Sequence, residues 1–129
     1  ENYLRAEVSS PDRSAGEITE GCCVVARAAR LRGAAVTFFK YTSKVIAGDG
    51  CSEICCELGY FYEETGDFEE AAVWYYNAAY ETQPVLALRS SEEEPLQGLI
   101  RCYEHLGLPA QARSYAEELK HRQNEQTDN

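Results

Sequence analysis

Six cysteines are the residues of this chain with the most chemistry open to them. Three of them, Cys51, Cys55 and Cys56, lie close together, and residues four apart share one face of a helix. A structural zinc site needs four ligands, however, and further ones could come only from Cys23 or His105, while the usual C-x2-C spacing is absent. We therefore expect no bound metal and keep a zinc-bound helical protein as an alternative that metal analysis would exclude.

The oxidation state expected of these thiols follows from where they lie in the chain. All six fall in segments with helical periodicity, and two pairs are direct neighbours, whose side chains point about 100° apart on a helix. Disulfide frameworks belong instead to loop-rich secreted domains. We therefore expect free, buried thiols and a cytoplasmic protein. The six are Cys22, Cys23, Cys51, Cys55, Cys56 and Cys102.

Histidines and acidic pairs are the other candidates for catalysis. His105 and His121 are the only histidines, and nucleophilic catalysis would need one of them beside a serine or cysteine in a pocket. His105 falls near a helix end, where a histidine ordinarily interacts with the helix dipole. Acidic pairs such as Glu63-Glu64 are typical of solvated helix faces, and there is no glycine-rich phosphate loop. We expect a protein without catalytic residues and without a cofactor.

The chain is strongly acidic, which excludes several classes of partner. Its net charge is −10 at pH 7 and its pI is about 4.6. Phosphate backbones and anionic lipid surfaces need clustered lysine and arginine, so we expect neither nucleic acid nor a membrane as partner. No apolar run reaches the roughly 20 residues that span a bilayer. The expected partner is a protein or peptide of neutral or basic character.

Length and composition fit a single folded domain. The 129 residues are enough to bury a core, and the beginning of the chain lacks the basic and apolar blocks of a signal peptide. The chain contains no methionine, and we interpret it as a segment of a longer protein.

A two-helix unit stands out between residues 51 and 82, CSEICCELGYFYEETGDFEEAAVWYYNAAYET. Its apolar residues recur at helical spacing in both halves. Between the halves, Gly66 can adopt the left-handed conformation that ends a helix. Asp67 and Glu70 then form a capping-box-like pair for the next helix. The unit predicts an antiparallel helical hairpin.

Two further segments follow the same plan. Residues 95–122 carry Gly107 as the break and Pro109 in the first turn of the following helix, where its missing N–H is tolerated. Residues 18–47 carry Gly33 as the break, although the residue after it offers no capping side chain. The three glycines are spaced by 33 and 41 residues, so the second interval contains an insertion.

These units resemble the tetratricopeptide repeat, a helical hairpin of 34 residues with small and aromatic residues at fixed positions. The resemblance covers residues 51–122 and, with fewer matching positions, residues 18–47. In the last unit, Ile100 stands where glycine is usual and Ala116 where an aromatic residue is usual. The matching residues are Leu58, Gly59, Tyr62, Gly66, Asp67, Ala71, Tyr75, Ala78 and Pro84 in the middle unit, Leu99, Tyr103, Gly107 and Ala112 in the last, and Val25 and Gly33 in the first.

The resemblance implies an all-α fold. Three antiparallel hairpins, 18–47, 51–82 and 95–122, would form a right-handed superhelical stack. Residues 1–17 would be an N-terminal arm or the remnant of a preceding repeat. Residues 123–129 contain no apolar side chain, and we expect them to be a disordered tail.

The resemblance also implies a concave groove, lined by the first helix of each hairpin, that holds a peptide or helix. Because glutamates dominate this surface and arginines alternate with them, we expect a peptide of mixed or basic charge rather than a C-terminal carboxylate. Charge reversal at Glu63 and Glu64 is then expected to weaken binding without unfolding the domain. The implied groove residues are Glu20, Cys23, Arg27, Arg30, Glu53, Cys56, Tyr60, Glu63, Glu64, Gln97, Arg101, Glu104 and His105.

The second helix of the middle hairpin is unusually apolar. Between residues 71 and 80, Asn77 is the only polar interruption. A helix of this kind is normally surrounded, and a central position between neighbouring hairpins would explain it. Alternatively, Trp74 or Tyr76 is partly exposed and docks a partner or a second copy of the chain.

The expected function is that of a non-catalytic scaffold for protein–protein interaction. The alternative is an accessory region of a larger bacterial enzyme such as a glycosyltransferase, because the segment AAVWYYNAAYET is similar to tetratricopeptide regions appended to such enzymes. A neighbouring catalytic domain in the full reading frame would favour this alternative, and an independent short gene would exclude it.

Overall fold

The computed structural model describes residues 15–48, 50–82 and 93–127, with side chains for all of these except 15–18 and 125–127. The described residues form helices joined by turns and contain no strand, which confirms the all-α prediction. The helices are α2 (Ala15–Leu31), α3 (Ala35–Ala47), α4 (Ser52–Glu64), α5 (Phe68–Tyr76) with its π-helical continuation η1 (Asn77–Glu81), α6 (Glu93–His105) and α7 (Pro109–Thr127).

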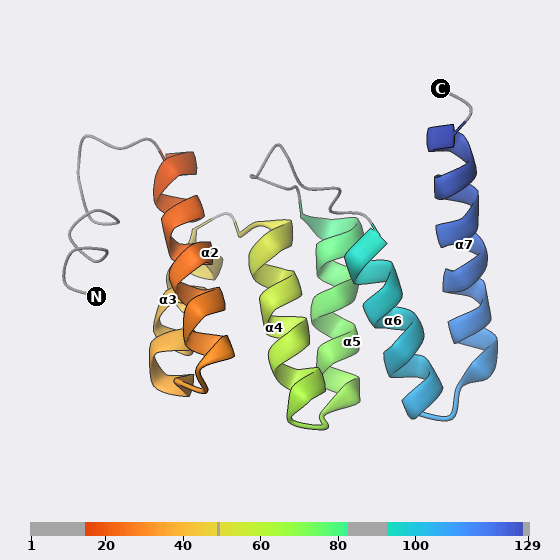
Figure 1. Ribbon diagram of the computed structural model, residues 1–129, viewed down its shortest axis with the longest axis horizontal. Helices are drawn as coiled ribbons and strands as arrows, with labels where there is room; N and C mark the ends of the chain where they lie inside the picture. The colour runs from red at the N-terminus through yellow and green to blue at the C-terminus, as the bar shows by residue number, and fades with distance from the viewer. Residues whose placement is uncertain (1–14, 49, 83–92, 128–129) are drawn as a thin grey trace.

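Consecutive helices pair in antiparallel fashion, α2 with α3, α4 with α5 and α6 with α7 (Figure 1). The three pairs follow one another in a row, and the turns within the pairs all lie along the same edge of this row (Figure 1). Neighbouring pairs meet chiefly through α5 and α6, with further contact of α4 against both α2 and α6. The helix pair α4–α5 is therefore enclosed by a pair on either side.

The three turns share one geometry. Gly33, Gly66 and Gly107 have φ values of 74°, 86° and 74°, the left-handed conformation that a residue without a Cβ adopts readily. In each turn the N–H after the glycine donates to a carbonyl five residues earlier, with N···O distances of 2.8, 2.9 and 2.9 Å. The glycine breaks predicted from the sequence are therefore confirmed. The predicted cap of α5 is also present, since Asp67 Oδ1 accepts from the Glu70 N–H at 3.2 Å.

The buried side chains form two clusters, and the middle helix pair contributes to both. The first joins α2 and α3 to α4 and contains five of the six cysteines. The second joins α5 to α6, with Tyr75, Leu96 and Leu99 fully buried. All six cysteines are buried and free, as predicted. Contact with the two cores accounts for the buried apolar residues of α5 and η1, but not for the exposed ones.

Two boundaries differ from the sequence predictions. Helix α2 begins at Ala15, inside the predicted arm 1–17, and the remaining residues of that arm, 1–14, lie outside the described residues. Helix α7 continues to Thr127, so the predicted disordered tail 123–129 is wrong for 123–127, while 128–129 are not described. Extending a formed helix is far easier than starting one, and the glutamine and glutamate of this segment are good helix formers.

Candidate functional site

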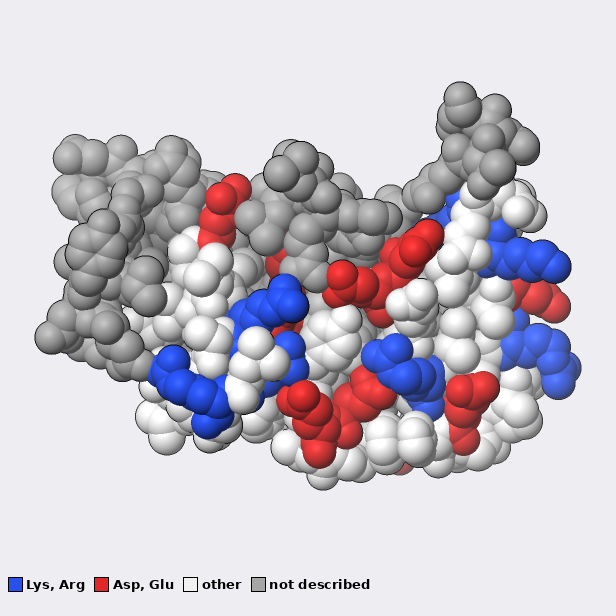
Figure 2. All heavy atoms as spheres, in the orientation of Figure 1, with Lys and Arg blue, Asp and Glu red and all other residues white. Residues whose placement is uncertain are grey.

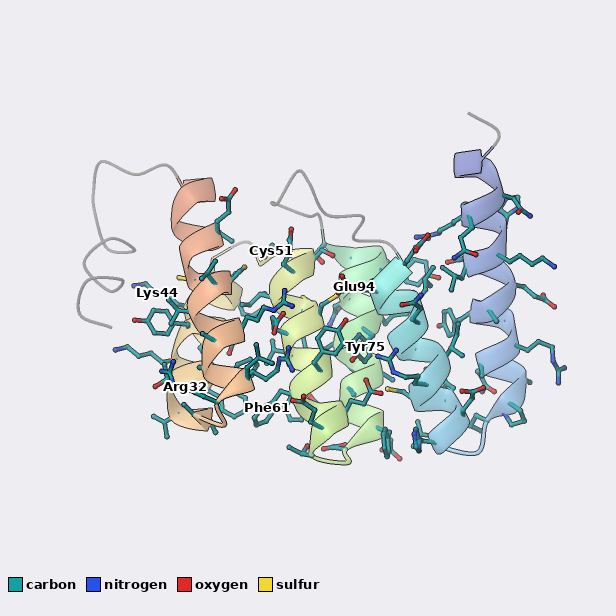
Figure 3. All side chains as sticks on the ribbon, viewed as in Figure 1. Arg32, Lys44, Cys51, Phe61, Tyr75 and Glu94 are labelled. Atoms are coloured by element: carbon teal, nitrogen blue, oxygen red, sulfur yellow. The ribbon has the colours of Figure 1, made fainter. Side chains whose placement is uncertain are left out.

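Tyr75 lies where α4, α5 and α6 meet (Figure 3). Its side chain is fully buried. The ring is held between Gly59 of α4 and Gly98 of α6, and a Cβ at either position would come within 2.6 Å of ring carbons. Since real Cβ contacts are never this short, the two glycines make room for the ring. The glycine-and-aromatic spacing in the sequence thus reflects direct packing across helices.

The hydroxyl of Tyr75 connects this packing to an ion pair. It donates to Glu63 Oε1 at 2.6 Å, and Arg101 donates to the same carboxylate through Nε at 2.7 Å and Nη2 at 3.1 Å. Burial alone would raise the pKa of Glu63, but the hydrogen bonds from Arg101 and Tyr75 outweigh it and lower the pKa. Burial and the bond to Glu63 raise the pKa of the Tyr75 hydroxyl. The ion pair and the hydroxyl together join all three helices.

A second polar network joins α2 to α4 and α6. Arg30 Nε donates to Glu57 at 2.8 Å and its Nη1 donates to Glu64 at 3.0 Å. The Arg30 guanidinium also lies 5.0 Å from the centre of the Tyr60 ring, a cation–π contact. The Tyr60 hydroxyl in turn donates to Glu94 at 2.9 Å. These contacts hold neighbouring helix pairs together through charged groups.

We call the surface formed by Arg30, Glu57, Tyr60, Glu63, Glu64 and Arg101 the charged face. Figure 2 shows acidic and basic side chains interspersed on the side of the molecule where α2 lies in front of α3. The structure brings the predicted groove residues Arg30, Tyr60, Glu63, Glu64 and Arg101 together on this face, but most of their charges already bind one another.

The other predicted groove residues divide into two groups. Glu53 and Cys56 are only 3% and 5% exposed, so the prediction that they line a groove is wrong. Cys23 is likewise buried. The cause is contact of the first half of α4 with neighbours on several sides, which no helical periodicity within α4 reveals. Arg27, Gln97, Glu104 and His105 are exposed and Glu20 is half-buried, and the His105 ring stacks on Phe68 with centroids 4.2 Å apart.

The cysteines were the chief candidates for chemistry. Cys23 Sγ lies 3.6 Å from Cys51 Sγ, a hydrogen bond between thiols of α2 and the start of α4. This bond and the backbone N–H groups of Ile54 and Glu53 lower the pKa of Cys51, against the effect of burial, while the same bond raises the pKa of Cys23. Among the described residues, no group of three or more His, Cys, Asp or Glu side chains is placed to hold a metal ion.

The outer side of α5 borders a different kind of surface, which we call the α5–α6 hollow. It has a volume of about 470 Å³. Its walls are largely apolar, and several of the surrounding side chains are strongly exposed: Val73 by 53%, Tyr76 by 42% and Leu108 by 40%. The lining residues are Glu69, Ala72, Val73, Tyr76, Asn77, Tyr103, Leu106 and Leu108.

Aromatic contacts fix one end of this hollow. The Tyr76 and Tyr80 rings lie 4.8 Å apart, and the Tyr103 ring stacks on Tyr115 with centroids 5.7 Å apart. Tyr80 also donates a hydrogen bond to Glu118, which pairs with Arg122 of the same helix. These contacts tie the wall formed by α5 to α7, so the hollow is a preformed feature of the fold.

A second hollow, the α3–α5 hollow, lies on the other side of α5. Its volume is about 400 Å³. Trp74 borders it and is half-buried against the first core cluster, with an indole N–H that has no hydrogen-bond partner in the described part of the chain. The two residues of the predicted docking patch, Trp74 and Tyr76, therefore border different hollows. The lining residues are Phe39, Thr42, Ser43, Ile46, Ala47, Leu58, Tyr62 and Trp74.

The sequence pointed to Tyr76 but missed its neighbours in the α5–α6 hollow. Val73, Leu106, Leu108 and Glu69 were not singled out. An available signal was that α5 is apolar on nearly all sides, which is more than two cores require. The side left uncovered could not be identified without the packing of α6 and α7.

Comparisons of this chain with protein-family models, with curated proteins and with solved structures found no match. The likeness to tetratricopeptide repeats thus rests on the residues of the chain itself. Within the described residues, no helix combines the length and the hydropathy that crossing a lipid bilayer requires.

Proposed function

We propose that this chain is a non-catalytic interaction module that binds a partner protein in the α5–α6 hollow. The observation that carries the proposal is the exposure of Val73, Tyr76 and Leu108 around a preformed apolar hollow. Contiguous exposed apolar side chains on a soluble domain are typical of a surface that another molecule covers. A volume of about 470 Å³ is comparable to that of clefts that bind small molecules, so the hollow has room for side chains of a partner.

The charged face is the less favourable site for the same function. A ligand there would compete with ion pairs such as Arg101–Glu63 and Arg30–Glu57, whose N···O distances are 2.7 and 2.8 Å. Breaking a partly buried pair leaves a charge without its partner, which opposes binding. In the α5–α6 hollow, by contrast, binding would remove apolar surface from water and displace no ion pair of a lining residue.

The proposal includes a finer description of the fold. Three helix pairs with the same turn geometry, arranged in one row, support a right-handed tetratricopeptide-like stack. In that arrangement α3, α5 and α7 are the second helices of their pairs. The proposed site thus lies between the second helix of the middle pair, α5, and the end of α6, whereas the groove implied by the resemblance is lined by first helices alone.

The occupant that we propose is an α-helix of a partner protein with an apolar face. A helix presents apolar side chains at intervals of one turn, and such side chains can enter a hollow that is bordered by exposed apolar residues. A second copy of this chain is a poor occupant because each copy has a net charge of −10 and the two would repel.

Selection of helical peptides from an unbiased displayed library, using the intact protein as bait, tests this proposal. The selected peptides should bind the Val73→Ala and Tyr76→Ala variants at least about tenfold more weakly, as for anchoring contacts. The matched control is Val36→Ala, which removes an equally small part of an exposed valine on α3 and should leave binding unchanged. Circular dichroism of each variant would verify the fold.

Three outcomes would contradict the proposal. One is a selection that returns no binding helix, and another is a set of helices that bind Val73→Ala as well as they bind the unchanged protein. The third is self-association of the protein in sedimentation experiments that Tyr76→Ala abolishes, because the hollow would then hold a second copy.

A further inference from the structure

The lining of the α5–α6 hollow contains one acidic residue, Glu69. Its side chain is exposed and has no ion pair with any residue that the structure describes. The hollow thus has an apolar interior with one uncompensated negative charge in its lining.

Resting on the function proposed above, we infer that the α5–α6 hollow selects a partner helix that carries an arginine or lysine next to a large apolar side chain. The apolar side chain fills the space between Val73, Tyr76 and Leu108, and the cation reaches Glu69. The occupant is therefore a basic amphipathic helix rather than a neutral one.

The lining of the hollow can contact both the aliphatic stem and the charged head group of such a side chain. The aliphatic stem of an arginine or lysine packs on apolar wall residues while its head stays in water. Tyrosine rings, here Tyr76 and Tyr103, attract a cation placed over their faces. The Glu69 carboxylate accepts a charge-assisted hydrogen bond from the head group. The net charge of −10 further favours the approach of a basic helix.

Glu69 also has a role within the fold that must be separated from binding. It lies in the first turn of α5, where a negative charge interacts favourably with the helix dipole. Glu69→Gln therefore lowers stability slightly whether or not the side chain contacts a ligand. The interaction with the helix dipole cannot, however, make the loss of affinity depend on the charge of the peptide. Such a dependence therefore identifies a direct contact of Glu69 with the ligand.

A double-mutant cycle with a selected peptide measures this property. The probes are a helical peptide from the library selection and its counterpart with the basic residue replaced by glutamine. Glu69→Gln should weaken binding of the basic peptide by about three- to tenfold, less so at high salt, and should leave binding of the neutral counterpart unchanged. The matched control, Glu20→Gln on α2 in the first helix pair, should affect both peptides equally.

The outcomes of this experiment separate the inference from the proposed function. If the selected helices depend on Val73 and Tyr76 but are neutral or acidic, or if Glu69→Gln weakens both peptides equally, the inference is overturned and the proposed function stands. If the helices are indifferent to Val73 and Tyr76, the proposed function itself fails.

Discussion

Tyr75 and Tyr76 are neighbours in the chain with opposite environments. Tyr75 is fully buried between two glycines, and its hydroxyl donates a hydrogen bond to Glu63. Tyr76 is 42% exposed and borders the α5–α6 hollow. Successive residues of a helix point about 100° apart, so one helix presents one tyrosine to the core and the next to the outer surface.

Helix α5 thus separates the residues that hold the molecule together from those available for binding. On the inner side, ring packing, a hydroxyl and an ion pair satisfy one another across three helices. On the outer side, apolar side chains surround a hollow that none of the described residues fills. Substitutions on the inner side should therefore change stability, and those on the outer side should change binding.

The largest effect on stability is expected from Tyr75→Ala. Removal of the ring empties the space between Gly59 and Gly98, and should lower the free energy of unfolding by about 3–5 kcal/mol. Urea denaturation followed by circular dichroism measures this change. Tyr75→Phe keeps the ring and lacks only the hydroxyl, so its free energy of unfolding should fall by only about 1 kcal/mol. Equal losses in the two variants would show that the packing of the ring contributes little.

A smaller effect is expected from Gly98→Ala. The added Cβ would meet the Tyr75 ring at 2.6 Å, so α6 and α5 must shift apart, at a cost of about 1–3 kcal/mol. Gly48→Ala is the control, because its Cβ would meet nothing closer than 3.5 Å, and its effect should stay within about 0.5 kcal/mol. If Gly98→Ala were as well tolerated as Gly48→Ala in thermal denaturation, the close approach of α6 to the ring would be wrong.

The next effect is the pH dependence that Glu63 contributes. Its pKa is lowered in the folded protein from an ordinary value of 4.5, so the unfolded chain binds a proton more readily than the folded one. Stability from this group is present above pH 4.5 and is lost as the pH falls through the lower folded pKa. Glu63→Gln should be about 1 kcal/mol less stable at neutral pH and should lose less stability as the pH falls below 4.5.

Urea denaturation at a series of pH values measures how the free energy of unfolding of each protein changes with pH. Parallel curves for Glu63→Gln and the unchanged protein would exclude the ion pair with Arg101 as a source of stability. Charge reversal at Glu63 is expected to lower stability as well, because a lysine there would face Arg101.

The smallest effect on stability is expected from Tyr76→Ala. Much of this side chain is already in water, and its loss should lower the free energy of unfolding by less than about 1 kcal/mol. A decrease comparable to that of Tyr75→Ala, measured by the same denaturation, would show that the two sides of α5 are not separate in function.

The sequence predicted much of the inner side and little of the outer one. Glycine breaks are encoded locally, because a positive φ favours one residue type, so Gly33, Gly66 and Gly107 could be identified without a structure. The small-and-aromatic spacing likewise marked Gly59 and Tyr75 as packing positions. These features depend on short-range geometry.

Contacts between distant parts of the chain could not be predicted in this way. Glu63 and Arg101 were assigned to a ligand groove, but they bind each other across 38 residues of sequence. Burial of Glu53, whose side chain is only 3% exposed, was also missed, because the spacing of apolar residues does not predict a buried carboxylate. A helix that is apolar on all sides does not reveal which side its neighbours leave open, so Val73 and Leu108 were not recognised.

The most direct test of the binding surface is a map of amide chemical shifts in an ¹⁵N-labelled sample as a selected helical peptide is added. If the helix binds in the α5–α6 hollow, the largest changes will occur at residues around it, namely Val73, Tyr76, Asn77, Leu106 and Leu108. The contrary result is a set of changes concentrated at Arg27, Glu64, Gln97 and Glu104, with the residues of the hollow unaffected. It would place the ligand on or near the charged face and contradict binding in the α5–α6 hollow.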